Sequence, residues 1–410
     1  MSLLTDASLL LTPNANATSK LYSIIPSNGN GDFTGTRATT ATRVNSSGLI
    51  ETTAINVIRR DYSLGGCPNI LLEPQRTNLA LQSSSFDSAT WTKLNGSSVS
   101  LTSGVINPSG GTNSFKYIAS NLAFGGILRQ PLSVVSGVSH TFSFFAKKDN
   151  YRYVGIRFNT SLNSQSFPNY DFDTDTLNTQ GVAGATLSRE LWPNGWVRLI
   201  LTFTTTTTNG NPDIAITTAN GDTSTALSGG QSVFIWGAQL EQGAYATSYI
   251  PTTTASVTRN ADSITRNNIF TNGLITSAGG TWFVELRNNV ARVRDTASRI
   301  AIGDTVSFTT NSLILIPPVS LNRASIAKTI GGVITTLFTT TTDTCKIAIN
   351  WNGSTANVFV NGVKVVSSSS FTTTNMEFFG NSSIGVPYFI NEMALFPTPL
   401  TDAQCIALTQ

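Results

Sequence analysis

Acidic side chains at alternate positions are the first candidates for chemistry in this sequence. The segment YDFDTDTLNTQG places Asp171, Asp173 and Asp175 on one side of an extended stretch, and three carboxylates there could bind a calcium ion. An EF-hand loop would need glycine at 176 and glutamate at 182, where the chain has Thr176 and Val182. The three aspartates therefore form only a weak calcium candidate. The alternative is a polar hairpin edge that discourages pairing between sheets.

The single histidine, His140, removes most other catalytic arrangements. Imidazole-rich zinc sites need several histidines, and the usual serine nucleophile needs a histidine next to a placed acid. The sequence contains no G-x-S-x-G elbow, no G-x-x-x-x-G-K-[ST] loop and no G-x-G-x-x-G fingerprint after a strand. Because His140 is in phase with Phe142 and Phe144, we expect it to pack in a core. We expect no catalytic residue and no cofactor, although sequence alone does not exclude a carboxylate pair for glycoside hydrolysis.

Aromatic side chains on the outer face of a predicted strand form a candidate glycan-binding surface. In YRYVGIRF, Val154, Ile156 and Phe158 alternate as a core row, so the residues between them face the other side. Sugars bind aromatic platforms flanked by polar groups. The candidate residues are Tyr151, Tyr153, Arg157, Trp192 and Trp196. The alternative is that these aromatics pack under loops, against another domain or in a subunit interface.

Charged residues are rare in this chain but gather in one segment. Asp, Glu, Lys and Arg make up 11% of the residues, against about 25% in ordinary soluble domains. The segment RDYSLGGCPNILLEPQRTNLALQSSSF surrounds an apolar run with ionic groups. Its notable residues are Arg60, Asp61, Leu71, Leu72, Glu73 and Arg76. Such a concentration indicates either a catalytic cluster or contacts that hold segments or chains together.

The overall composition excludes several classes of function. The net charge of +3 is spread along the chain without a basic run, so we expect no nucleic-acid partner. No stretch approaches the roughly 18 apolar residues of a membrane span. The N-terminus MSLLTDASLLLTPN has no cationic region of the signal-peptide kind, so we expect synthesis in the cytoplasm. Cys67, Cys345 and Cys405 are odd in number and far apart, which favours buried free thiols over disulfides.

The pattern of the chain predicts an all-β protein with an N-terminal region and two β-sandwich (jelly-roll) domains. Runs such as LTFTTTTTNGN favour strands, because threonine is β-branched. We expect an N-terminal arm and attachment region over 1–82, a first sandwich over 83–252, a linker over 253–280 and a second sandwich over 281–410. In the second sandwich, Asn361-Gly362 predicts a hairpin turn, and Thr401 with Gln404 predicts a capped C-terminal helix.

Three segments resemble a family of bacteriophage structural proteins of the head-fibre, head-spike or tail-fibre type. They are RATTATRVNSSGLIE, RRDYSLGGCPNILLEPQRTNLALQSSSF and WGAQLEQGAYATSYIPTTTASVTRNAD. The resemblance implies a carbohydrate-binding-module-like jelly roll after an N-terminal block. The segments TWFVELR, VFVNGVKV and NEMALFPTPLTDAQCIAL resemble a concanavalin-like or laminin-G-like sandwich. The family implies a virion component, commonly a homotrimer, attached through its N-terminal region to capsid or tail proteins.

The expected function is therefore a fibre or spike on the surface of a phage particle, with projecting sandwiches that serve host attachment. In this interpretation the segment 60–86 is an assembly and anchoring element, in which Glu73, or Asp61 of an adjacent chain, fixes Arg76. The alternative is an intrachain salt bridge with no role in assembly. Two other functions stay open: a host-glycan adhesin, and a depolymerase of surface polysaccharide.

Overall fold

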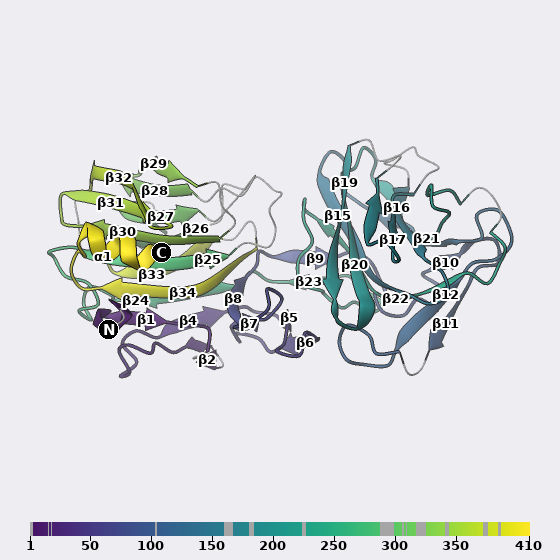
Figure 1. The fold of residues 1–410 in the computed structure, drawn as a ribbon, viewed down its shortest axis with the longest axis horizontal. Coiled ribbons are helices and arrows are strands. Elements are labelled where there is room, and N and C mark those ends of the chain that lie inside the picture. The colour runs from purple at the N-terminus through teal and green to yellow at the C-terminus, as the bar shows by residue number, and fades with distance from the viewer. Residues whose placement is uncertain are drawn as a thin grey trace. The chain divides into compact units, whose positions relative to one another are not determined.

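The computed structural model shows a chain built almost entirely of β-strands (Figure 1). It describes residues 1–410 except 1–2, 15, 18, 103–104, 160–166, 180–183, 224–226, 288–298, 306, 309, 317–324, 341–343, 372–375 and 384–386. The strands pair antiparallel into sheets that enclose apolar cores. This confirms the predicted all-β sandwich class. None of the helices in the described ranges is long and apolar enough to cross a membrane.

The chain divides into two compact units. We call residues 1–46, 52–75 and 260–410 the terminal unit, and residues 47–51 and 76–259 the central unit. The division differs from the predicted boundaries, because residues 1–46 and 52–75 belong with the C-terminal sandwich and do not form a region of their own. The physical reason is that this stretch has too few apolar residues for a separate core. Its buried residues Leu9, Leu11 and Ile70 instead share a core with Trp282.

Two sheets enclose the core of the central unit. The β15 sheet has the strand order β11 (Ser98–Thr102), β12 (Ser114–Ile118), β22 (Ser232–Gln242), β15 (Ser139–Lys148), β20 (Trp196–Thr204) and β19 (Ala185–Trp192). The β21 sheet has the order β10 (Thr92–Lys93), β13 (Ile127–Arg129), β21 (Asn209–Ile216), β16 (Tyr153–Asn159), β17 (Asn169–Asp171) and β18 (Thr176–Asn178), and β14 (Leu132–Ser133) also pairs with β21. The 3-10 turns η2 (Leu94–Gly96) and η3 (Pro193–Gly195) lie between strands.

The core faces predicted for β15 and β16 are confirmed, and β20 and β22 contribute to the same core. The alternating residues of four strands meet in one buried cluster, and they include Phe142, Phe144, Val154, Ile156, Phe158, Val197, Leu199, Leu201, Phe203, Val233, Ile235 and Leu240. His140 is fully buried and stacks on Phe203 with 6.2 Å between ring centroids. The histidine therefore packs in the core, as its phase with the phenylalanines predicts.

Two further sheets enclose the core of the terminal unit. The β25 sheet has the order β32 (Val363–Ser370), β31 (Thr355–Val360), β30 (Thr344–Trp351), β25 (Gly280–Arg287), β34 (Tyr388–Phe396), β8 (Asn69–Leu72) and β7 (Arg59–Asp61), and β1 (Leu9–Leu11) also pairs with β34. The β33 sheet has the order β2 (Asn16–Ala17), β3 (Lys20–Leu21), β4 (Phe33–Thr36), β24 (Ser263–Asn267), β33 (Phe378–Ser383), β26 (Arg299–Gly303), β27 (Ser312–Ile316), β28 (Ser325–Ile330) and β29 (Val333–Thr339). Strands from both ends of the sequence thus complete each sheet.

The chain passes between the units at defined places. It does so near β5 (Ala41–Val44) and β6 (Ile50–Thr53), and again at residues 75/76 and 259/260. In the central unit, β9 (Arg76–Asn78) pairs antiparallel with β23 (Val257–Arg259), so the segments next to the last two crossings are joined. Because β23 and β24 lie within it, the stretch 253–280 is partly built of strands, and the predicted linker is not a simple connector.

Local signals at the C-terminus are confirmed. Asn361 and Gly362 adopt φ values of 46° and 79° between β31 and β32, as a two-residue hairpin turn requires. The Thr401 hydroxyl accepts a hydrogen bond from the backbone N–H of Gln404, and the Gln404 side chain accepts one from the N–H of Thr401, at the start of α1 (Asp402–Thr409). The short turn η1 (Leu3–Asp6) lies at the other end of the chain. The cysteines are free: Cys345 and Cys405 are buried, but Cys67 is exposed, contrary to the prediction.

Candidate functional site

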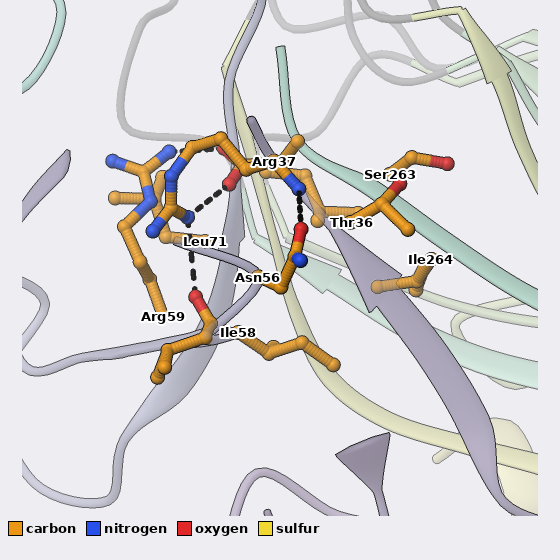
Figure 2. A pocket seen from close by; sticks show the side chains of 11 residues that line it. Thr36, Arg37, Asn56, Ile58, Arg59, Leu71, Ser263 and Ile264 are labelled. Carbon is orange, nitrogen blue, oxygen red and sulfur yellow. Dashed lines mark hydrogen bonds and ion pairs between the residues drawn. The ribbon is translucent and has the colours of Figure 1, made fainter. Parts of the chain in front are cut away.

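A buried network of two arginines and two carboxylates lies in the terminal unit. Figure 2 shows its two arginines, Arg37 and Arg59. The Asp262 carboxylate accepts hydrogen bonds from Arg37 Nη1 at 2.8 Å, from Arg59 Nη2 and from the backbone N–H of Glu73 at 2.9 Å. Glu73 Oε2 accepts a second hydrogen bond from Arg59, at 2.6 Å. The four residues are 0–5% exposed. We call this set, Arg37, Arg59, Glu73 and Asp262, the Arg–carboxylate network.

Segments far apart in the sequence supply these four side chains. Arg37 follows β4, Arg59 begins β7, Glu73 follows β8 and Asp262 precedes β24. Arg37 also donates to the backbone carbonyls of Thr39 and Ala54 at 2.9 and 2.7 Å. The network therefore ties the N-terminal strands to the C-terminal part of the same unit.

The charges of the network are stabilised by one another. Burial disfavours the charged form of Arg59, but Asp262 and Glu73 outweigh burial and raise its pKa above the ordinary value. Burial lowers the pKa of Arg37, and Asp262 opposes that shift. Two positive and two negative groups balance, so the cluster carries no net charge that would attract an ionic substrate. The network therefore has a structural role, in which ion pairs link distant segments of the chain.

A small pocket lies next to the network (Figure 2). Its lining includes Thr36, Asn56, Ile58, Leu71 and Ser263 together with Arg37, Arg59 and Asp262. The volume is about 10 Å³, which is room for about one water molecule. A sugar ring is much larger, so this pocket is too small to be a glycan site.

The residues predicted for assembly mostly serve contacts within the chain. Glu73 pairs with Arg59. Arg76 donates to the Tyr245 hydroxyl and lies over that ring at 4.7 Å, within the central unit. Leu71 and Leu72 are 4% and 1% exposed, so neither offers an apolar surface to another chain. Glu73 thus forms an intrachain salt bridge, and a role of this segment in assembly stays a prediction.

The other two predicted assembly residues lie at β7. Asp61 accepts hydrogen bonds from the backbone N–H groups of Val44 and Ser63, both at 2.8 Å, and burial raises its pKa. Arg60 is half-buried, and its carbonyl accepts a hydrogen bond from Arg43. Asp61 therefore holds neighbouring backbone in place and does not pair with Arg76.

Sequence reasoning missed three members of the network. Arg59 directly precedes the predicted segment, and Arg37 and Asp262 lie 22 residues before and 203 residues after Arg59. The sequence feature that could have pointed to these residues is the phage-protein resemblance, because its three segments contain them. No spacing rule brings such distant positions together, because the pairing depends on which strands share a sheet.

A second polar network fixes the same segments in the central unit. The Asn78 amide donates to the carbonyls of Ala238 and Ile250 at 3.1 and 2.8 Å, and its oxygen accepts from the N–H of Leu240 at 3.0 Å. The hydroxyls of Ser83 and Tyr249 are hydrogen-bonded at 2.6 Å. Asn78, Ser83 and Tyr249 are all buried. The segment after residue 75 is thereby pinned to β22 and to the chain that follows it.

The predicted glycan surface is divided between different environments. Tyr151 and Tyr153 are half-buried and form an edge-to-face pair with 5.9 Å between ring centroids. Arg157 is 5% exposed, because it pairs with the buried Asp213 at 2.8 Å and lies over the Phe167 ring. It is not on an open face.

The two tryptophans of that prediction lie on the β15 sheet, whereas the tyrosines lie at the β21 sheet. Trp196 is 1% exposed and donates to the carbonyl of Ile106 at 2.8 Å. Trp192 packs edge-on against Phe145 at 5.1 Å. The structure thus brings together Tyr151 and Tyr153 and places the two tryptophans on the other sheet of the central unit.

The three candidate calcium ligands are each paired with a cation. Arg152 Nε donates to Asp171 at 2.9 Å, Lys148 pairs with Asp173, and Arg189 Nε donates to Asp175 at 2.6 Å. The hydrogen bonds from Arg152 lower the pKa of Asp171 to about 2. Among the residues that the structure describes, no group of three His, Cys, Asp or Glu side chains is placed to hold a metal ion. The aspartates thus act as ion-pair partners on a polar edge.

Comparison with known proteins gives only distant structural similarity. No family model matches the chain, and no curated protein matches it. Domain 4 of AbnA, an extracellular arabinanase from Geobacillus stearothermophilus solved with arabinotriose, is 16% identical over 41% of this chain and 83% of its own, with a TM-score of 0.29. The tandem CBM22 domains of Paenibacillus barcinonensis Xyn10C are 9% identical over 80% of this chain and 99% of their own, with a TM-score of 0.27.

A structure of botulinum neurotoxin type C, whose cell entry depends on interaction with two ganglioside molecules, is 12% identical over 36% of this chain and 39% of its own, with a TM-score of 0.28. At these identities and scores, the similarity carries no argument about function.

Proposed function

We propose that this chain is a structural component of a bacteriophage virion, a fibre or spike exposed on the particle. One observation carries the proposal. The three segments that resemble phage structural proteins supply the Arg–carboxylate network and the hydrogen bonds of Asn78, which fix the chain in both units. The segments that resemble this family are thus the ones that hold the fold together, which indicates a shared architecture. The low content of ionic residues also suits a protein that works through stable contact.

The proposed role is not enzymatic. Four carboxylates of the central unit, Asp171, Asp173, Asp175 and Asp213, pair with arginines or lysines. A general acid needs a carboxyl with a raised pKa facing a substrate, so Asp171, whose pKa is lowered, does not suit that role. Incubation with host surface polysaccharide should leave its chain length unchanged, and shortening of the polysaccharide would establish the depolymerase instead.

The proposal places attachment in the N-terminal part of the terminal unit. Because Leu71 and Leu72 are buried, the surface for capsid or tail proteins must come from other residues of that region. Tyr22 and Ile24 are 43% and 49% exposed and offer apolar contact area. We expect Ile24→Lys to reduce incorporation of the protein into particles.

The test is the protein content of purified particles of the phage that encodes the chain. Mass spectrometry and electron cryomicroscopy should find this chain on the particle surface, and its absence from purified particles would refute the virion assignment. Leu101→Lys is the matched control, because Leu101 is 60% exposed but lies on β11 of the central unit. Equal incorporation of both variants would refute attachment through Ile24. The proposed homotrimer predicts three times the 43.6 kDa chain mass in solution.

A second candidate function, host-glycan binding, rests on Tyr151 and Tyr153. Their edge-to-face pair lies next to Arg152, whose guanidinium is 4.8 Å from the centre of the Tyr153 ring. Half-buried aromatics next to a charged donor are the groups on which a sugar ring can stack. Glycan arrays with Tyr151→Ala and Tyr153→Ala test this function, and Tyr22→Ala is a control with an exposed tyrosine in the other unit. Binding that both substitutions leave unchanged would argue against this surface.

A further inference from the structure

Strand β29 (Val333–Thr339) forms an exposed edge of the β33 sheet. It pairs with β28 on one side, and no described strand pairs with it on the other. The side chains of residues 333–336 are exposed, and Val333 and Ile334 are 67% and 45% accessible. An edge strand presents a row of N–H and C=O groups that another strand can pair with.

The sequence of β29 contains nothing that prevents such pairing. It reads VITTLFT, which has neither charge nor proline and consists mostly of residues with high strand propensity. The two described edge strands of eight residues both carry charges: β19 contains Arg189 and Glu190, and β32 contains Lys364. The edge strand β11 is also uncharged, but it has only five residues. Charged side chains on an edge are a common protection against pairing between sheets, and β29 has none.

We propose that β29 is a self-association edge, at which a second copy of this chain adds its own β29 antiparallel and extends the β33 sheet. The choice of a second copy follows from charge. A neutral strand meets its own copy without like charges, and the formal net charge of +3 on 410 residues leaves little overall repulsion between copies. The pairing has two-fold symmetry, which closes after two copies.

Two-fold pairing also suits the side chains of the strand. An axis perpendicular to the sheet at Thr335 places this residue opposite its own counterpart and Ile334 opposite the copy of Thr336. Cross-strand pairs of β-branched residues stabilise antiparallel sheets. The bulge of β29 between Thr336 and Phe338, opposite Ile326 and Ala327, limits the regular register to the first half of the strand.

The contact is small. Seven residues of strand extend over roughly 23 Å, and an interface built on one strand lies at the weak end of specific interfaces. Association should therefore depend on concentration in the micromolar range. This pairing can be told apart from a three-fold assembly, because it doubles the mass of the species that is present at low concentration.

Sedimentation velocity of the full chain from about 5 to about 500 µM tests the proposal, since weak interfaces dissociate across this range. We expect the mass to double with concentration, from 43.6 kDa if the low-concentration species is one chain. Ile334→Lys should weaken the doubling at least about tenfold, because it places a lysine in the shared edge. An equimolar mixture of Ile334→Lys and Ile334→Glu should associate more tightly than either variant alone.

The control is Leu101→Lys, a change at a residue 60% exposed on the edge strand β11. It should associate as the wild type does. Circular dichroism should show unchanged folding of each variant, since Ile334 is 45% exposed. No doubling of the wild type, equal doubling of Ile334→Lys, loss of doubling in Leu101→Lys, or a mixture no tighter than its components would each overturn the proposal.

Discussion

Removal of the Asp262 carboxylate is the most direct test of the Arg–carboxylate network. Asp262→Ala leaves Arg37 and Arg59, both almost fully buried, with one carboxylate between them, and leaves the Glu73 N–H without its acceptor. Breaking a buried ion pair by deleting one partner costs about 3–5 kcal/mol, because a charge stays buried without compensation. We expect the terminal unit to lose about that much unfolding free energy.

The control is an exposed pair in the same unit. Lys364 and Asp402 are 2.8 Å apart, with side chains 26% and 56% exposed. Water screens such a pair, so Asp402→Ala should cost only about 0–1 kcal/mol. The comparison of the two variants shows how much of the destabilisation comes from burial of the ion pairs and how much from the loss of a carboxylate itself.

Hydrogen exchange read by mass spectrometry in increasing urea is a suitable assay, because the two units need not unfold together. Peptides from β8 and β24 report on the terminal unit, and peptides from β15 report on the central unit. The terminal-unit midpoint of Asp262→Ala should fall by roughly 1–3 M urea, with the central unit unchanged. If Asp262→Ala loses no more unfolding free energy than Asp402→Ala, the structural role of the Arg–carboxylate network would be refuted.

Three further predictions concern single groups. Cys67 should react with a thiol reagent in the native protein, whereas Cys405, whose pKa burial raises to about 12, should react only after unfolding; equal rates would contradict the structure. Burial also raises the pKa of Tyr249 to about 12. Between about pH 10 and 12 the unfolded state therefore binds fewer protons than the native state, so the stability falls as the pH rises. Tyr249→Phe should flatten this dependence in central-unit unfolding measured at pH 9 and 11, and an unchanged slope would count against it. Gly362→Ala should destabilise the terminal unit by about 1–2 kcal/mol, because an L-residue at φ 79° is strained, and a Val363→Thr control should not.

The sequence predicted features that depend on neighbouring residues. The alternation of Val154, Ile156 and Phe158 gave the core face of β16, and Asn361-Gly362 gave the hairpin turn. The burial of His140 followed from its phase with Phe142 and Phe144. Such patterns repeat within one strand or turn, so a single segment contains the information.

The sequence misplaced residues whose environment depends on distant strands. Arg157 has the phase of an outward residue, yet Asp213 from β21 pairs with it and Phe167 covers it. The exposure of Cys67 likewise could not be read from composition. A residue on the second face of a strand is exposed or buried according to what packs over that face, and local periodicity does not contain this information.

The sequence by itself determined the all-β class, the turns and the inward faces, because each depends on the conformations of adjacent residues. Only the tertiary structure decided that Arg59 pairs with both Glu73 and Asp262, and that the first 75 residues, apart from 47–51, complete the C-terminal sandwich. The physical reason is that an ion pair forms where folding brings two charges within hydrogen-bond distance, and here 203 residues separate Arg59 from Asp262 along the chain.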